Sequence, residues 1–228
     1  MVERPRYTTV EMLPTDLAVF PLPGALLLPG GQMPLNIFES RYLNMIEDAL
    51  GHGRLIGMIQ PFAEKDERQI PDGTALYEVG CVGRIIQFTE TGDGRYVISL
   101  QGVCRFRVGK ELTGVDGYRR IRPDYTPYLS DLEVETLASD GTLEDRESLL
   151  AAMNRYFVLK GIEADIESIE GAPDGVLVTS LAMSCPFGPG EKQALLECAN
   201  TLERGRLLIS MFEFALHETG TPSSDMRQ

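Results

Sequence analysis

The most constraining feature of this sequence is a run of 22 residues, Leu17 to Phe38, without a charged side chain. Its length approaches the roughly 20 apolar residues that a membrane-spanning helix needs. Prolines and glycines interrupt the run, and each breaks the continuous helix that a bilayer requires. They are Pro21, Pro23, Pro29 and Pro34 with Gly24, Gly30 and Gly31. The run therefore excludes a membrane span and predicts short buried strands joined by tight turns.

The first half of the chain predicts a β-rich domain. Apolar or alternating stretches that favour strands lie at 17–20, 25–28, 55–60, 76–79, 81–89, 96–100, 104–108 and 118–125. Gly92-Asp93-Gly94 is typical of a hairpin turn, because glycine accepts positive φ. A one-sided apolar stripe predicts a helix from near Phe38 that ends at Gly51 and Gly53. Many short strands with frequent turns favour a small closed or folded-over sheet.

The second half changes to a helical pattern and to a strongly acidic composition. Residues 1–128 carry 14 basic and 16 acidic side chains, whereas residues 129–228 carry 7 and 18. Helices are expected from a cap at Asp140 or Thr142, at about 162–169, from Asp174 to the stop at Pro186, after 188–190, and from about Leu202. We therefore expect an α+β chain: an arm at 1–14, a β-rich domain at 15–128, an acidic helical bundle at 129–216 and a disordered tail at 217–228.

Charge and cysteine usage narrow the class of protein. The formal net charge is −13, so phosphate repels the chain and nonspecific nucleic-acid binding is disfavoured. The spacings of Cys81, Cys104, Cys185 and Cys198 match no zinc site, and the first two are expected to be buried. The N-terminus has no apolar signal region. These features predict a cytoplasmic protein with reduced thiols.

Tests for catalytic motifs fail. Between Gly102 and Gly109 lie six residues where a phosphate loop needs four, and Glu111 occupies the Ser/Thr position. The lysines lie in polar stretches, so no Ser–Lys dyad is indicated. His52 lies between glycines and His217 near the tail, which suits neither a triad nor a metal site. We expect no catalytic residue, no cofactor and no metal.

Two sets of residues are candidates for binding. A charged docking face for acidic peptide or RNA would consist of Arg105, Arg107, Arg119, Arg120 and Arg122; solvated or ion-paired arginines are the alternative. A cleft for an extended apolar peptide would be lined by Leu26, Leu28, Phe38, Tyr42, Phe62 and Phe187, with burial in the core as the alternative.

Several segments together resemble a known family. FPLPGALLLPGGQMPLNIFESRYLNMIEDAL, GCVGRIIQF, ISLQGVCRFRV and SCPFGPGEKQALLECANTLERGRLLISMFE occur in this order. The chain resembles the N-terminal substrate-recognition domain of Lon proteases over roughly residues 15–216, and in particular small bacterial proteins that carry this domain alone.

The resemblance implies a PUA-like, barrel-like sheet followed by a helical bundle. It also implies recognition of unfolded or tagged polypeptide segments, with a protease as a second candidate partner. Lon proteases continue into ATPase and protease modules, whereas this sequence ends before either, so we expect a non-catalytic adaptor, holdase-like factor or regulator of proteolysis. An RNA-binding PUA-like module is the alternative.

Overall fold

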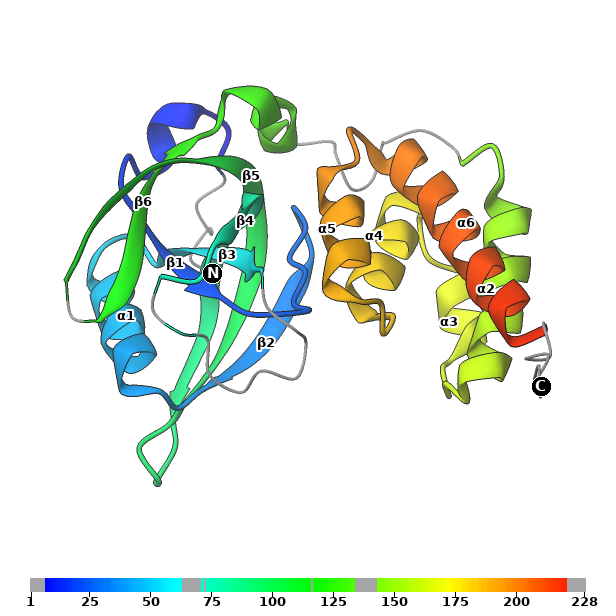
Figure 1. Cartoon of the computed structure of the whole chain (residues 1–228), viewed down its shortest axis with the longest axis horizontal. Helices are drawn as coiled ribbons and strands as arrows, with labels where there is room; N and C mark the ends of the chain where they lie inside the picture. The colour runs from blue at the N-terminus through cyan, green and yellow to red at the C-terminus, as the bar shows by residue number, and fades with distance from the viewer. Residues whose placement is uncertain (1–6, 63–70, 72, 116, 134–142, 221–228) are drawn as a thin grey trace, which may run out of the picture. The chain divides into compact units, whose positions relative to one another are not determined.

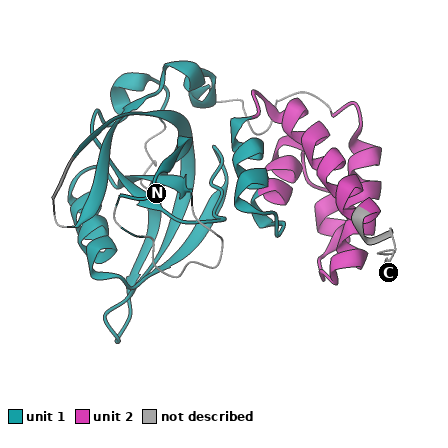
Figure 2. Cartoon of the chain, viewed as in Figure 1, with its two compact units in different colours: residues 1–136, 183–197 teal, residues 137–182, 198–228 magenta. Residues whose placement is uncertain are grey.

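The chain divides into two compact units in a computed structural model, which describes residues 7–62, 71, 73–115, 117–133 and 143–220 (Figure 1). Unit 1 comprises residues 1–136 and 183–197, and unit 2 comprises residues 137–182 and 198–228 (Figure 2). The expected α+β class, with a β-rich part followed by helices, is confirmed. No described helix combines the length and the apolar character needed to cross a bilayer.

Unit 1 contains the sheet. Its elements are η1 (Val10–Met12), β1 (Leu17–Pro21), β2 (Gln32–Ile37), α1 (Ser40–Gly51), β3 (Leu55–Pro61), β4 (Leu76–Glu90), β5 (Tyr96–Val115), β6 (Tyr118–Asp124), η2 (Thr126–Leu132) and α5 (Pro189–Glu197). The strand order is β2-β5-β4-β3-β1-β6, and a further pairing of β5 with β6 closes five strands into a barrel-like sheet. Strand β2 lies outside this closure and pairs with β5.

The interior of the closed sheet is packed around Phe106, which is fully buried. A Cβ at Gly80 would meet both the Phe106 ring and the Met58 carbonyl oxygen, so this strand position needs glycine. Outside the closed part, the aromatic rings of Phe20 and Tyr42 lie 4.3 Å apart and join β1 to the buried face of α1. Both layers therefore consist of apolar side chains that the sequence places on alternating strand positions or one helix face.

Several expectations about unit 1 require correction. Residues 25–28 form no strand, although Leu26, Leu27 and Leu28 are buried. The strands expected at 76–79 and 81–89 are one strand, β4, and those at 96–100 and 104–108 belong to β5. Strand β2 was not expected. At the end of the expected arm, Leu13 is buried in the core and Tyr125 donates a hydrogen bond to the Pro14 carbonyl at 2.9 Å.

Helix α5 belongs to unit 1 because polar side chains bind it to the sheet. The buried amide of Gln60 accepts a bond from Gly24 N–H at 2.9 Å and donates to the Pro189 carbonyl at 2.7 Å. Gln193 donates from Nε2 to the Val79 carbonyl at 3.1 Å. The sequence had placed residues 189–197 in the acidic helical bundle. The expected limits of that bundle, 129 and 216, remain a prediction.

Unit 2 is helical. It contains α2 (Arg146–Lys160), α3 (Ile166–Glu170), most of α4 (Asp174–Ser184) and α6 (Thr201–Gly220). The rings of Tyr156 and Phe212 lie 4.8 Å apart where α2 and α6 pack together. Arg146 forms an ion pair with Asp174 and donates to the Glu170 and Ala172 carbonyls at 2.8 Å, which fixes the start of α4.

Other expectations concern the ends of these helices. Helix α6 extends through the first residues of the expected tail; residues 221–228 lie outside the described part of the chain. The expected caps at Asp140 and Thr142 also lie outside it.

Candidate functional site

The apolar candidates divide into buried and exposed side chains. Leu26, Leu28, Tyr42 and Phe187 are buried, which favours the core alternative for these four. Phe38 and Phe62 are 60% and 59% exposed. Of the six candidates, only these two present an aromatic surface to solvent, and their role in binding stays a prediction.

The two exposed phenylalanines have different surroundings. Phe62 stacks on Tyr77, with ring centres 4.0 Å apart and planes 15° from parallel. Phe38 directly follows β2, and the Arg95 guanidinium lies 5.9 Å from its ring centre. Phe62 thus has one face covered by an intramolecular partner, whereas Phe38 lies at the end of an open strand.

The five arginines differ in their partners. Arg105 is buried against Asp131, Arg119 forms an ion pair with Glu111 at 2.7 Å, and Arg122 lies 3.3 Å from Asp16. Arg107 and Arg120 make no ion pair with any described residue. A single docking face made of all five is therefore not supported, because Arg105 is inaccessible.

The cysteines offer no activated nucleophile. Burial raises the pKa of Cys104 and Cys185 to about 12 and raises that of Cys81 well above its ordinary value. A thiol must ionise to attack, so these three are inert near neutral pH. The expected burial of Cys81 and Cys104 is confirmed. Among the described residues, no group of His, Cys, Asp and Glu side chains is arranged to hold a metal ion.

One exposed sheet surface brings uncharged side chains together. Residues directly opposite one another in paired strands share a face. Three such rows cross β2, β5 and β4: Gln32–Gln101–Arg84, Pro34–Ser99–Gln87 and Asn36–Val97–Thr89. A register shift between Ile85 and Gln87 keeps the three rows on one side. We call these nine residues, together with Phe38 directly after β2, the arm face. The name does not refer to the expected arm at 1–14.

The arm face differs from the opposite side of the same strands. On that side Ile37, Ile85, Ile98 and Leu100 are buried. On the arm face Gln32, Pro34, Asn36, Gln87 and Thr89 are exposed, and Val97 is 44% exposed. Ser99, in the middle of the face, is buried, and Arg84 and Gln101 are partly exposed. The three strands are therefore covered on one side, and most positions on the other side are accessible.

Arg84 is the functional candidate that sequence reasoning missed. It is partly buried, and its Nε is enclosed without a hydrogen-bond partner in the described structure. Arg84 also makes no ion pair with a described residue. Its place at the end of the Gly80-x-x-Gly83-Arg84 motif was the available signal, although that motif indicated family rather than function.

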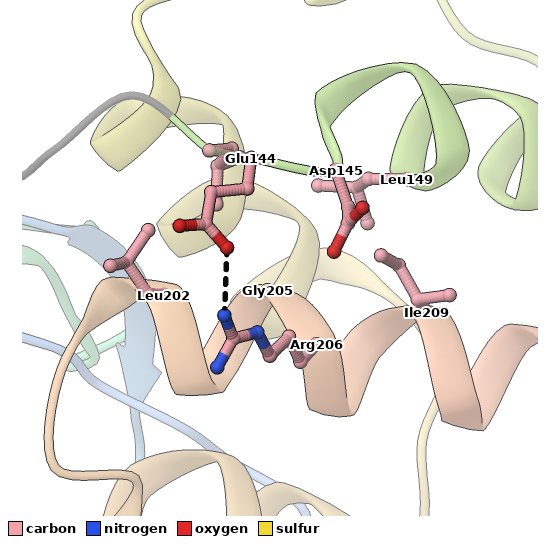
Figure 3. Close-up of a pocket in the computed structure, with 8 residues that line it drawn as sticks. Glu144, Asp145, Leu149, Leu202, Gly205, Arg206 and Ile209 are labelled. Atoms are coloured by element: carbon pink, nitrogen blue, oxygen red, sulfur yellow. Dashed lines mark hydrogen bonds and ion pairs between the residues drawn. The ribbon is translucent and has the colours of Figure 1, made fainter.

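Two hollows in the described surface are small. In unit 2, Leu149, Leu202 and Ile209 line a space of ≈ 10 Å³ beside the Glu144–Arg206 ion pair; Figure 3 shows the Glu144 carboxylate directed at the guanidinium. In unit 1, Arg41 and Arg119 border a space of ≈ 10 Å³. Each has room for about one water molecule, so neither can enclose a larger ligand.

A closed sheet with an added edge strand, followed by a helical unit, defines an α+β fold. The chain belongs to the family described as the ATP-dependent protease La (LON) substrate-binding domain, which matches residues 16–213.

Curated relatives agree with this assignment. Lon protease 2 of Sorangium cellulosum is 30% identical over 200 residues, which cover 86% of this chain and 24% of that protein. Lon protease of Flavobacterium johnsoniae is 32% identical over 201 residues, which cover 85% of this chain and 23% of that protein. The chain thus spans about a quarter of the length of the curated relatives it matches.

Solved structures share the fold. The Lon N-terminal domain protein from Xanthomonas campestris has 25% sequence identity and a TM-score of 0.58, covering 86% of this chain and 98% of that chain. The N-terminal domain of Mycobacterium avium complex Lon protease has a TM-score of 0.58 at 18% identity, which shows the fold alone.

Proposed function

We propose that this chain binds polypeptide segments non-covalently and performs no chemical step. It acts in the cytoplasm as an adaptor, a holdase-like factor or a regulator of proteolysis. The observation that carries this proposal is membership of a substrate-binding family over residues 16–213. Exposed Phe38 and Phe62 are consistent with it, because apolar surface left in contact with water is what an unfolded segment can cover.

The arginine pairing argues against the RNA-binding alternative. RNA affinity needs cations that are free to contact phosphate, and the net charge of −13 opposes approach. Arg105, Arg119 and Arg122 are already engaged by carboxylates. Arg107 and Arg120 alone form too small a basic patch to overcome that repulsion.

The binding proposal is tested with an unfolded client of known state. Reduced, carboxymethylated α-lactalbumin labelled with fluorescein should bind saturably in fluorescence anisotropy, and native α-lactalbumin should not. Binding that depends on apolar contact should persist as salt rises. Equal signals for both forms would contradict the proposal. So would strongly salt-dependent binding of a single-stranded RNA 20-mer in place of the client.

The absence of chemistry is tested separately. Incubation of the protein with ATP and casein should release neither phosphate nor peptide fragments. The controls are repurification and expression in a protease-deficient host. If either product still forms after both, the non-catalytic part of the proposal is wrong. This result would leave the binding part standing.

A further inference from the structure

We propose that the arm face is the surface that takes the polypeptide, and that Arg84 binds a carboxylate side chain of the bound segment. The inference rests on the proposed function and adds to it a location and a substrate class. The preferred ligand is an extended, otherwise uncharged segment with one Asp or Glu and an apolar residue further along.

The charge distribution selects this surface. The chain carries 34 acidic and 21 basic side chains, yet the three rows of the arm face contain one ionisable residue, Arg84. Covering a charged side chain costs desolvation free energy, whereas covering the apolar side chains of Pro34 and Val97 does not. A polypeptide can therefore lie across these strands without removing an acidic group from water.

Arg84 supplies the specific contact. Enclosing part of a guanidinium without a partner is unfavourable, and the cost falls when an anion accepts its hydrogen bonds. Arg105, on the neighbouring strand β5, shows a guanidinium whose hydrogen bonds are made, since two of its nitrogens donate to the Asp131 carboxylate at 2.9 Å. No described carboxylate does this for Arg84, so a carboxylate of a bound ligand can accept its hydrogen bonds.

The amide side chains explain tolerance of sequence. Gln32, Asn36, Gln87 and Gln101 each carry a donor and an acceptor, and none bonds to another group in the described part of the chain. A main chain that passes over the face offers the matching carbonyl and N–H groups. These contacts depend on the backbone of the ligand and not on its side chains.

The edge of β2 is the competing way to hold an extended segment, and Pro34 closes it. Pro34 pairs with Ser99, and the pairing of β2 with β5 continues without a break on both sides of it. Since proline has no N–H to donate to β5, its backbone nitrogen lies on the side of β2 that faces away from β5. An added strand would lose the central hydrogen bond of the edge and would meet the proline ring. The ligand therefore contacts the face and not the edge.

The dimensions set the length of the ligand motif. Gln32, which lies in the row of Arg84, and Phe38 are six positions apart. This offset spans about 20 Å in extended chain. The carboxylate on Arg84 and an apolar side chain on Val97 or Phe38 thus lie about four to six ligand residues apart.

The test uses a fluorescein-labelled 12-residue peptide of Gln, Ser and Val, with blocked ends, one Glu and one Phe five residues away. Wild-type protein should bind it about tenfold or more tightly than the same peptide with Gln for Glu. Arg84→Gln should lose the same factor for the Glu peptide and almost none for the Gln peptide. Arg107→Gln, which removes an exposed and unpaired arginine elsewhere on β5, is the matched control and should change neither affinity.

Two further variants address the apolar end. Val97→Asp and Thr89→Asp place a charge on exposed positions of the arm face, and each should weaken both peptides at least tenfold without lowering the melting temperature. Phe214→Asp, on an exposed position of α6, is the control. Equal changes of affinity in Arg84→Gln and Arg107→Gln would overturn the assignment. Unchanged affinity in Val97→Asp and Thr89→Asp would also overturn it.

The α-lactalbumin assay separates the two proposals. If the wild-type protein does not bind the unfolded client, the proposed function fails. If it binds, and the arm-face variants bind equally well, only the present inference fails.

Discussion

Arg105 and Asp131, which are 26 residues apart in the chain, form an ion pair with two N–O contacts of 2.9 Å in the interior of unit 1. Asp131 also accepts the Arg105 backbone N–H at 2.9 Å, and Arg105 Nη1 donates to the Leu196 carbonyl at 3.1 Å. One guanidinium thus joins β5, η2 and the last turn of α5.

Breaking this pair should be costly. Asp131→Asn keeps the shape but leaves the Arg105 charge buried without a counter-ion, which should lower the free energy of unfolding by about 3–5 kcal/mol. Urea denaturation followed by circular dichroism measures the change. Asp16→Asn, which removes the partner of exposed Arg122, is the control and should cost less than about 1 kcal/mol. Equal effects would show that Arg105 is not isolated from solvent.

Strand β2 should become a site of self-association when its proline is removed. Pro34→Thr supplies the missing N–H and a β-branched side chain, so two copies can pair through their edges. Sedimentation velocity should show a new, concentration-dependent dimer. Asn36→Thr raises strand propensity on the same edge without adding a donor, and it should remain like wild type. A monomeric Pro34→Thr variant would contradict the protective role.

The Glu111–Arg119 pair should make stability depend on pH in the acidic range. The hydrogen bond from Arg119 lowers the pKa of Glu111 below its ordinary value of 4.5. The folded state therefore binds the proton less readily than the unfolded state. The pair's contribution is complete above pH 4.5 and is lost as the pH falls through the folded-state pKa.

Glu111→Gln isolates this contribution. The variant should be less stable than wild type by about 0.3–1 kcal/mol at pH 7, since the pair is partly exposed. The difference should shrink as the pH falls below 4.5 and through the folded-state pKa of Glu111, as measured by urea denaturation at each pH. A difference that grows on acidification would contradict the sign.

Thiol reactivity should report the burial of the cysteines. Cys81, Cys104 and Cys185 are buried, and burial raises the pKa of each, whereas Cys198 is partly accessible. Ellman's reagent at pH 8 should modify one thiol of the native protein rapidly and all four in 6 M guanidinium chloride. Cys198→Ser should abolish the rapid phase. Fast modification of a second thiol would show that one of the buried sites opens.

The sequence predicted features whose cause is local. The turn at Gly92–Gly94 was recognisable because Gly94 needs a φ of 77°, and Thr91 N–H closes the turn on the Arg95 carbonyl at 2.9 Å. The α4 limits followed from Asp174 and Pro186, which start and stop a helix through their own chemistry. Buried Cys81 and Cys104 followed from their apolar strand context.

The features that sequence reasoning missed depend on residues far along the chain. Strand β2 contains Pro34 and polar residues and forms because β5, about 60 residues later, supplies its hydrogen bonds. Residues 25–28 are as apolar as a strand but are held by burial and by turn hydrogen bonds, from Ala25 N–H to the Leu22 carbonyl and from Gly31 N–H to the Leu28 carbonyl. Arg105 alternates with apolar residues, which is the pattern of an exposed arginine. It is buried because it pairs with Asp131, 26 residues later in the chain.

Unit 1 is built from two separate stretches of chain, because α5 is translated only after α2, α3 and α4. During synthesis, Leu196 can therefore meet Arg105, and Gln193 can meet Val79, only after these three helices have been made. A ribosome-bound product that stops at 136 would lack this closing helix. It would lack the Leu196 carbonyl that accepts from Arg105, so completion of the β-rich unit is coupled to translation of the helical one.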